Sequence, residues 1–377
     1  MNNKVVEYFA PNVKVDKTKD QLRQSRNEQI LSAYAPLDVV TDIDVNWLYS
    51  SIILFPLPDL HAGNINARLD LFDTWVKTVR DTYNSAVILN GDIFDNATQT
   101  SVSNTHDENL PPEEIVDYLY NKFLPLAKQG KIVAVTPGNH DSKDSKRGVD
   151  ANISVLKILA NRLQVPFVEH NALITFNMPI EGSTQKGKFV VAAMHGAGKG
   201  GGTAKSLDVM KAQIDRIITK CHVDLAITGH THPPKGAITS VRYEEPIKDR
   251  YNRTIGSTTK EKVIMVCPTL QADSDYAAAV NMGQAHPNAF MAVVKMKPNP
   301  YYKTNEHENN KFIPKIAPME MFKEDGKLCL NAQMVLANYY LDSAKIEKEV
   351  TQENKTSTLV ELVTKANNGG MNRWVNI

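Results

Sequence analysis

Residues 131–144, KIVAVTPGNHDSKD, join an apolar run to a polar loop, and this junction recurs along the chain. The run ends at Pro137-Gly138, a pair that favours a turn. Three polar side chains, Asn139, His140 and Asp141, follow at once. A turn does not need an amide, an imidazole and a carboxylate in succession. These side chains are therefore either part of a solvated loop or part of a chemical site.

The composition is typical of a soluble globular protein. The chain has 377 residues, enough for one large domain or two ordinary ones. Apolar residues make up 42% and charged residues 23%, which predicts a substantial core. Lysine and arginine number 43 against 42 aspartates and glutamates, so the net charge says nothing about nucleic-acid or membrane partners.

The cysteines and the N-terminus indicate a reducing compartment. Cys221, Cys267 and Cys329 are far apart and odd in number, which argues against a disulfide framework and a cysteine zinc site. The N-terminus lacks the apolar core of a secretory signal. The most apolar run, SIILFPLP, is too short to cross a bilayer. We expect a cytoplasmic protein without a membrane partner; the sequence leaves the oligomeric state open.

Outward from residues 131–144, strand-like runs alternate with helical patterns, which predicts a layered α/β domain. The expected strands lie within 51–63, 85–96, 131–144, 167–178, 187–202 and 223–235, and the expected helices at 66–83, 111–130, 153–163 and 206–220. Further strands are expected within 237–244, 262–270 and 289–297. We predict a domain at 51–299, because residues 1–50 and 300–377 are more polar and read as N- and C-terminal extensions.

Polar clusters follow five of the expected strands. They are Asp59 with His61, Asp92 with Asp95, Asn139 with His140 and Asp141, His195 alone, and His230 with His232. Loops beyond the carboxyl ends of strands in an open α/β sheet converge on one crevice, where ligands bind. Any one cluster alone is common in solvated turns. Together they hold five of the ten histidines, and they predict a metal or catalytic site.

The ligand types indicate the metals. Histidine, aspartate and asparagine without cysteine suit divalent manganese, iron or zinc, and a shared carboxylate can bridge two ions. Two such ions stabilise both the attacking and the leaving oxygen of a phosphoryl displacement. We expect two divalent ions, manganese first, with iron, zinc and magnesium as alternatives.

The clusters DLH, GDIFD, GNHD, MHG and GHTH, in this order, resemble the five-part motif of the calcineurin-like metallophosphoesterase superfamily. The resemblance covers residues from about 51 to 297 and implies a four-layered α-β-β-α sandwich. It also implies the ligands: Asp59, His61 and His232 for the first metal, Asn139, His195 and His230 for the second, and Asp92 bridging the two.

The same resemblance gives His140 a different role. In the family this histidine protonates the leaving oxygen or steadies the phosphoryl group, with the position of Asp95 as its carboxylate partner, and a metal-bridging hydroxide is the nucleophile. An imidazole beside a carboxylate is a suitable proton donor near neutral pH.

The motif variants favour phosphodiesters as substrates. Serine/threonine phosphatases of the family carry GDYVDRG and usually glutamate after GNH, whereas this chain has GDIFDN and GNHD, which look more like the nuclease and phosphodiesterase branches. We expect a phosphodiesterase, for example a nuclease on DNA or RNA. The alternatives are a phosphomonoesterase acting on a nucleotide or phosphoprotein, and a non-catalytic scaffold, which the complete ligand set opposes.

Three basic residues are candidates for substrate binding. Lys143 and Arg147 follow the GNHD motif, and Lys199 lies in a glycine-rich loop after His195. We expect them to contact phosphates; the alternatives are a solvated loop and a flexible lid. The glycine-rich loop also resembles uncharacterised phage phosphoesterases, and a phage protein would act in the host cytoplasm.

Overall fold

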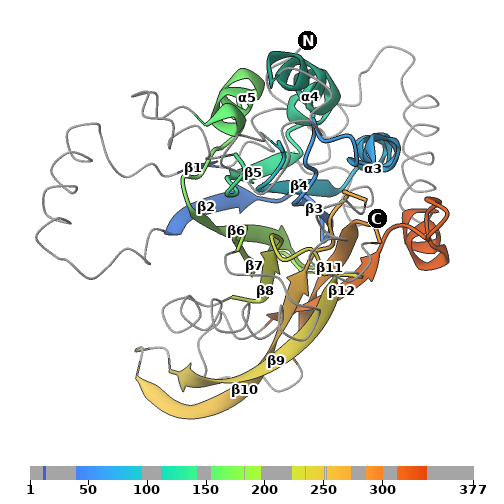
Figure 1. The fold of residues 1–377 in the computed structure, drawn as a ribbon. Coiled ribbons are helices and arrows are strands. Elements are labelled where there is room, and N and C mark those ends of the chain that lie inside the picture. The colour runs from blue at the N-terminus through green and yellow to red at the C-terminus, as the bar shows by residue number, and fades with distance from the viewer. Residues whose placement is uncertain are drawn as a thin grey trace, which may run out of the picture.

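Two β-sheets lie face to face, and three helices cover the outer face of one of them (Figure 1). The computed structural model describes residues 12–13, 40–95, 112–141, 154–181, 183–196, 223–233, 235–249, 251, 253–272, 286–299 and 312–337. The predicted α/β class is confirmed. The helix expected at 206–220, which the fourth layer would need, lies outside the described residues.

The first sheet has seven strands in the order β1-β2-β6-β7-β8-β10-β9. They are β1 (Asn12–Val13), β2 (Val40–Asn46), β6 (Asn171–Pro179), β7 (Lys186–Ala193), β8 (Leu225–Thr228), β10 (Thr254–Val266) and β9 (Ala237–Lys248). β7, β8 and β10 run parallel to one another, so their carboxyl ends reach the same edge of the sheet.

The second sheet has five strands in the order β12-β11-β3-β4-β5. They are β12 (Phe312–Glu320), β11 (Phe290–Pro298), β3 (Ser51–Leu57), β4 (Ser85–Asn90) and β5 (Ile132–Thr136). β3, β4 and β5 are parallel, and every residue in them is buried. Burial on both faces explains why these strands read as continuous apolar runs rather than as alternating patterns.

The helices α3 (Leu69–Asp81), α4 (Pro112–Lys128) and α5 (Val155–Leu163) form on amphipathic segments. α4 begins at a proline followed by two glutamates, which suit the positive end of the helix dipole. The Ser154 side chain caps α5 by accepting a hydrogen bond from the Lys157 backbone N–H. Each helix follows a strand of the five-stranded sheet; α3 and α4 form β-α-β crossovers to β4 and β5, whereas α5 leads to β6 of the other sheet.

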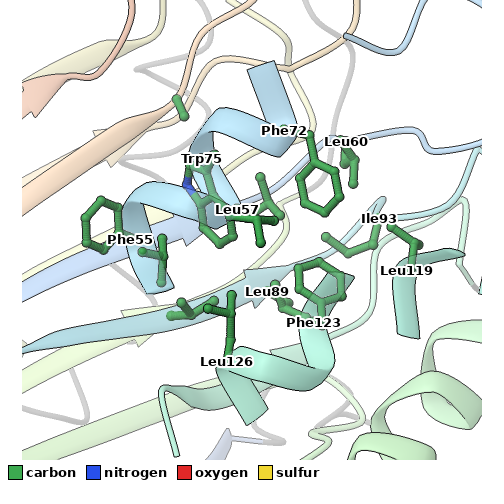
Figure 2. Close-up of a cluster of buried hydrophobic side chains, with 14 of the residues drawn as sticks. Phe55, Leu57, Leu60, Phe72, Trp75, Leu89, Ile93, Leu119, Phe123 and Leu126 are labelled. Carbon is green, nitrogen blue, oxygen red and sulfur yellow. The ribbon is translucent and has the colours of Figure 1, made fainter. Parts of the chain in front are cut away.

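The five-stranded sheet separates two cores, because alternate side chains of a strand point to opposite faces. Phe55 points toward the helices and packs edge-on against Trp75, with ring centroids 6.3 Å apart. Phe72 stacks on Trp75 and meets Phe123 of α4 edge-on (Figure 2). Leu54 points the other way, into the core between the two sheets.

The fold uses residues on both sides of the predicted domain limits at 51 and 299. β2 pairs with β6, and β12 pairs with β11. After β12, Phe322 and Leu336 are buried in the core that contains α3. The side chain of Asn288 accepts a hydrogen bond from the Phe322 N–H and donates one to the Phe322 carbonyl, which fixes this segment to the body.

Phe72→Ala tests the aromatic core under the helices. Phe72 is fully buried, so we expect a loss of about 3–5 kcal/mol in the free energy of unfolding from lost contacts and a residual cavity. Met334→Ala, at a side chain that is 61% exposed, is the control and should cost less than about 0.5 kcal/mol. Urea unfolding measures both. Equal losses in the two variants would contradict the packing described here.

Candidate metal centre

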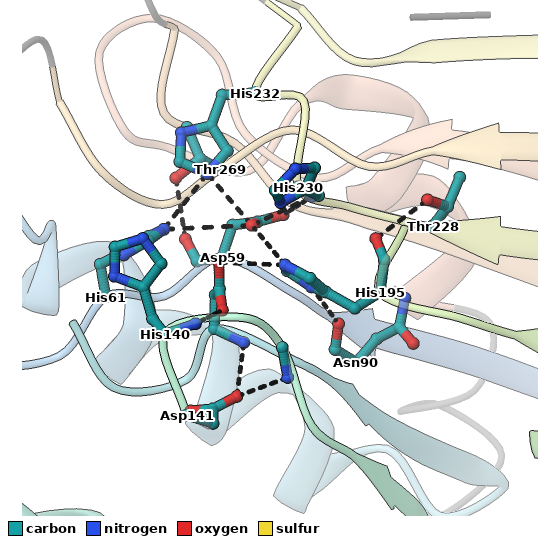
Figure 3. A network of polar contacts seen from close by, with 12 residues as sticks. Asp59, His61, Asn90, His140, Asp141, His195, Thr228, His230, His232 and Thr269 are labelled. Atoms are coloured by element: carbon teal, nitrogen blue, oxygen red, sulfur yellow. Dashed lines mark hydrogen bonds and ion pairs between the residues drawn. The ribbon is translucent and has the colours of Figure 1, made fainter. Parts of the chain in front are cut away.

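The loops after β3 and β4 extend the pairing of these two strands past their ends. Asp59 N–H donates to the Gly91 carbonyl and His61 N–H to the Asp92 carbonyl, each at 3.0 Å. The next pair, Ala62 N–H and the Ile93 carbonyl, follows at 2.9 Å. The DLH and GDIFD motifs are thereby held side by side. Asp59 and His61 face the histidines that follow strands of the seven-stranded sheet (Figure 3), and Asp92 Oδ2 lies 3.0 Å from His195 Nε2.

The backbone is strained at the motif residues. Asp59, His61, Asp92, His230 and His232 have φ between 40° and 67°, the left-handed region. Non-glycine residues seldom occupy this region, and each costs of order 1 kcal/mol or more. Only one other non-glycine residue of the described chain, Gln164, shares this conformation. Such strain persists only where the surroundings enforce it, and it concentrates at functional sites.

Asp59, His61 and His232 form the first group of donor atoms. His232 Nε2 lies 3.1 Å from Asp59 Oδ1 and 3.2 Å from His61 Nε2. Burial opposes ionisation of Asp59, yet the imidazoles of His232 and His195 lower its pKa below the ordinary value. Burial also lowers the pKa of His61, which favours the neutral ring that a metal requires.

Asp92, His195 and His230 form the second group, with ligand atoms within 4.8 Å of one another. His195 Nδ1 lies 2.9 Å from the Asn90 carbonyl, which is a hydrogen-bond acceptor. Its Nε2 is buried and lies 3.0 Å from Asp92 Oδ2, but no hydrogen bond of suitable geometry joins them. Burial disfavours the imidazolium, yet the negative charge of Asp92 raises the pKa of His195 to about 10.

This donor set fits divalent metal ions. Carboxylate oxygens and imidazole nitrogens without thiolate are ligands that manganese, iron and zinc accept. The buried Nε2 of His195 makes no hydrogen bond and faces the Asp92 carboxylate, so a metal ion between the two groups would take the place of their ion pair. The two groups contain residues that follow strands of both sheets, and each group could bind a divalent metal ion.

Glycines precede three of the candidate ligands because no side chain fits there. A Cβ on Gly138 would lie 2.1 Å from Asp92 Oδ1, and one on Gly229 would lie 2.2 Å from Asp59 Oδ2. A Cβ on Gly91 would lie 2.5 Å from the His195 ring. The glycines of the GD, GN and GH motifs therefore let the backbone approach the ligand side chains closely.

His140 and Asp95 lie beside the first group. His140 donates its backbone N–H to Asp92 Oδ1 at 2.7 Å. Its Nδ1 is 2.7 Å from the Asp95 carbonyl and 3.3 Å from Asp95 Oδ1, whereas His61 Nδ1 is nearer that oxygen, at 3.0 Å. Asp95 thus lies between both histidines. Asn139 is exposed in the same turn, and its role as a ligand stays a prediction.

Asp141 had no role in the sequence-based prediction, although it ends the GNHD motif. Its buried carboxylate accepts hydrogen bonds from the backbone N–H groups of Asp92, Phe94 and Gly138, at 2.7, 3.2 and 2.8 Å. Burial and the charge of Asp92 raise the pKa of Asp141 to about 6. This side chain ties the GDIFD loop to the GNHD turn.

Thr269 and Asn90 were also missed. Thr269 follows β10, and its hydroxyl donates to the Asp59 carbonyl at 2.8 Å. Asn90 ends β4, and its amide donates to the Met194 carbonyl at 2.9 Å. Asn90 is the last residue of an apolar run and Thr269 follows one, and these positions were the sequence features that could have indicated a place at the centre. Lys143, Arg147 and Lys199 lie outside the described residues, so their substrate contacts remain predictions.

The comparison with known families agrees with this site. Residues 57–234 match the family model of calcineurin-like phosphoesterases, a range that includes every candidate ligand named above. Over these residues the chain resembles calcineurin-like phosphoesterases, and the match together with the Asp/His donor groups supports a metal-dependent phosphoesterase. No curated protein matches the sequence. In the part of the chain that the structure describes, no helix has the length and apolar character needed to span a membrane.

Gly138→Ala tests the close approach at the centre. The added methyl group would overlap Asp92 Oδ1, so we expect the Asp92 side chain to move. The affinity of the protein for its metal should then fall by at least about tenfold. Gly256→Ala is the matched control, because its Cβ would meet only Ile247 Cδ1, at 4.0 Å. Metal content after dialysis, measured by mass spectrometry, distinguishes them. Full metal content in Gly138→Ala would contradict the geometry.

Proposed function

We propose that this protein is a dinuclear phosphodiesterase, with DNA or RNA as the substrate class. The observation that carries the proposal is the pairing of two donor groups, around Asp59 and Asp92, with a histidine that belongs to neither of them and that forms a third group with His61 and Asp95. That histidine, His140, has its Nδ1 engaged by Asp95. One set of residues is thereby available for metal and another for proton transfer.

Asp59, His61 and His232 would hold the first ion, and His195, His230 and Asn139 the second, with Asp92 between them. Manganese is our first choice. Two divalent ions, when bound, neutralise the phosphate charge and lower the pKa of a coordinated water. The residues of the chain supply orientation: Asp59 is held by the His230 N–H at 2.9 Å, and Asp92 by the His140 N–H.

His140 is the proposed general acid. Its side chain is 14% exposed, whereas that of His61 is 3% exposed, so His140 is the more accessible of the two rings at Asp95. The Asp95 carbonyl accepts the proton on Nδ1, which leaves Nε2 as the atom that can give a proton to the leaving oxygen. The charge of Asp95 stabilises the imidazolium before transfer.

The diester preference rests on the motif variants GDIFDN and GNHD, which differ from those of the protein phosphatases. Cytoplasmic action belongs to the same proposal, and so do phosphate contacts by Lys143, Arg147 and Lys199.

The substrate class can be tested directly with the purified protein and Mn²⁺. We expect hydrolysis of bis-p-nitrophenyl phosphate and of single- or double-stranded nucleic acid, with slower hydrolysis of p-nitrophenyl phosphate. The Asp92→Ala protein is the control for contaminating enzymes. Turnover of the monoester with inert diesters and nucleic acids would replace this proposal with a phosphomonoesterase.

His140→Ala tests the division of roles. We expect this variant to keep both metal ions and to lose about 10²–10⁴-fold in kcat, with a smaller loss when the leaving group is p-nitrophenolate, which needs no proton. Asp92→Ala should lose metal and activity together. His170→Ala, an exposed histidine, should match the wild type. Loss of metal from His140→Ala would assign this residue to the ligands instead.

A further inference from the structure

A buried amide beside the centre has no role in the proposed chemistry. Asn64 is 4% exposed and follows the DLH motif by three positions. Its Oδ1 accepts the backbone N–H of Asn66 at 2.9 Å, and its Nδ2 donates to Asp95 Oδ2 at 3.0 Å. Because the Asn66 N–H requires an acceptor, the amide cannot be flipped, and the NH₂ group must face Asp95.

Asn64 therefore sets which way the Asp95 carboxylate faces. With Oδ2 held by the amide, Oδ1 is directed at His61 Nδ1, 3.0 Å away, and His140 Nδ1, 3.3 Å away. The two rings stand nearly perpendicular, at 88°, with centroids 4.7 Å apart. This carboxylate oxygen thus pairs with His61 and lies near His140, whose closer acceptor is the Asp95 backbone carbonyl, and the amide prevents rotation of the carboxylate.

The direction of Asp95 determines the tautomer of His61. An ionised carboxylate only accepts hydrogen bonds, so the proton of a neutral His61 must lie on Nδ1. His61 Nε2 is then unprotonated, and it faces His232 Nε2 at 3.2 Å, inside the first donor group. Residues that hold a ligand histidine by its other nitrogen in this way tune metal affinity.

We propose that Asn64 is a positioning residue that acts through Asp95, fixing the Nδ1–H tautomer of His61 for metal binding. The Asn64 backbone N–H donates to the His61 carbonyl at 3.1 Å, but its side chain reaches the His61 ring through the Asp95 carboxylate.

The Asn64→Asp variant distinguishes an effect on Asp95 and His61 from a role in holding only the Asn66 N–H of the same loop. The variant keeps an oxygen for the Asn66 N–H but places a second carboxylate oxygen against Asp95. We expect Mn²⁺ affinity, measured by titration calorimetry on the metal-free protein, to fall about 10–100-fold. Asn66→Asp is the matched control, because it adds the same charge to the same loop; its affinity should stay within about twofold of wild type.

Histidine tautomers provide the second readout. Long-range ¹H–¹⁵N spectra of metal-free, histidine-labelled protein should show His61 as the Nδ1–H tautomer, with a shift toward the Nε2–H form in Asn64→Asp. Wild-type His61 in the Nε2–H form would overturn the proposal even if the variant failed to fold. So would an Asn64→Asp protein that matches wild type in both measurements. Neither readout needs a substrate, so absent phosphodiesterase activity would count only against the proposed function.

Discussion

Buried carboxylates at one edge of two sheets are the constraint around which this centre is built. An ionised carboxylate loses several kcal/mol when it is removed from water unless it is paired and hydrogen-bonded. Asp59, Asp92, Asp95 and Asp141 are each at most 2% exposed. Each is compensated by groups from another loop: backbone N–H groups, imidazoles or the Asn64 amide. The carboxylates thus hold the loops together.

The same requirement explains the unusual backbone of the centre. To bring their side chains to one point, five motif residues adopt positive φ, and glycines remove the Cβ atoms that would block the approach. The cost of this strain is offset by the apolar cores on both faces of the five-stranded sheet, where strands and helices are fully packed. A rigid scaffold with a strained edge suits a site that must hold its ligands in place before metal binds.

Asp95 shows why the sequence predicted which residues would gather at the centre but not all of their contacts. The motif predicted a carboxylate partner for His140. The structure adds that His61 Nδ1 lies nearer the same oxygen, and that Asn64 holds the other one. Spacing along the chain carries no information about which of two rings a shared oxygen faces, because that depends on side-chain rotation within the packed site.

The sequence by itself determined the α/β class, the described strands and helices between residues 51 and 298, and the residues that gather at the strand ends. Apolar runs and polar clusters are local features, so they can be read from local pattern. The tertiary structure decided the roles of Asp141, Thr269, Asn90 and Asn64, and the place of β2 and β12 in the sheets. Those contacts join segments distant in sequence or depend on the rotamer of a buried side chain. A buried polar group has no water to bind, so it needs a hydrogen-bond partner within the protein.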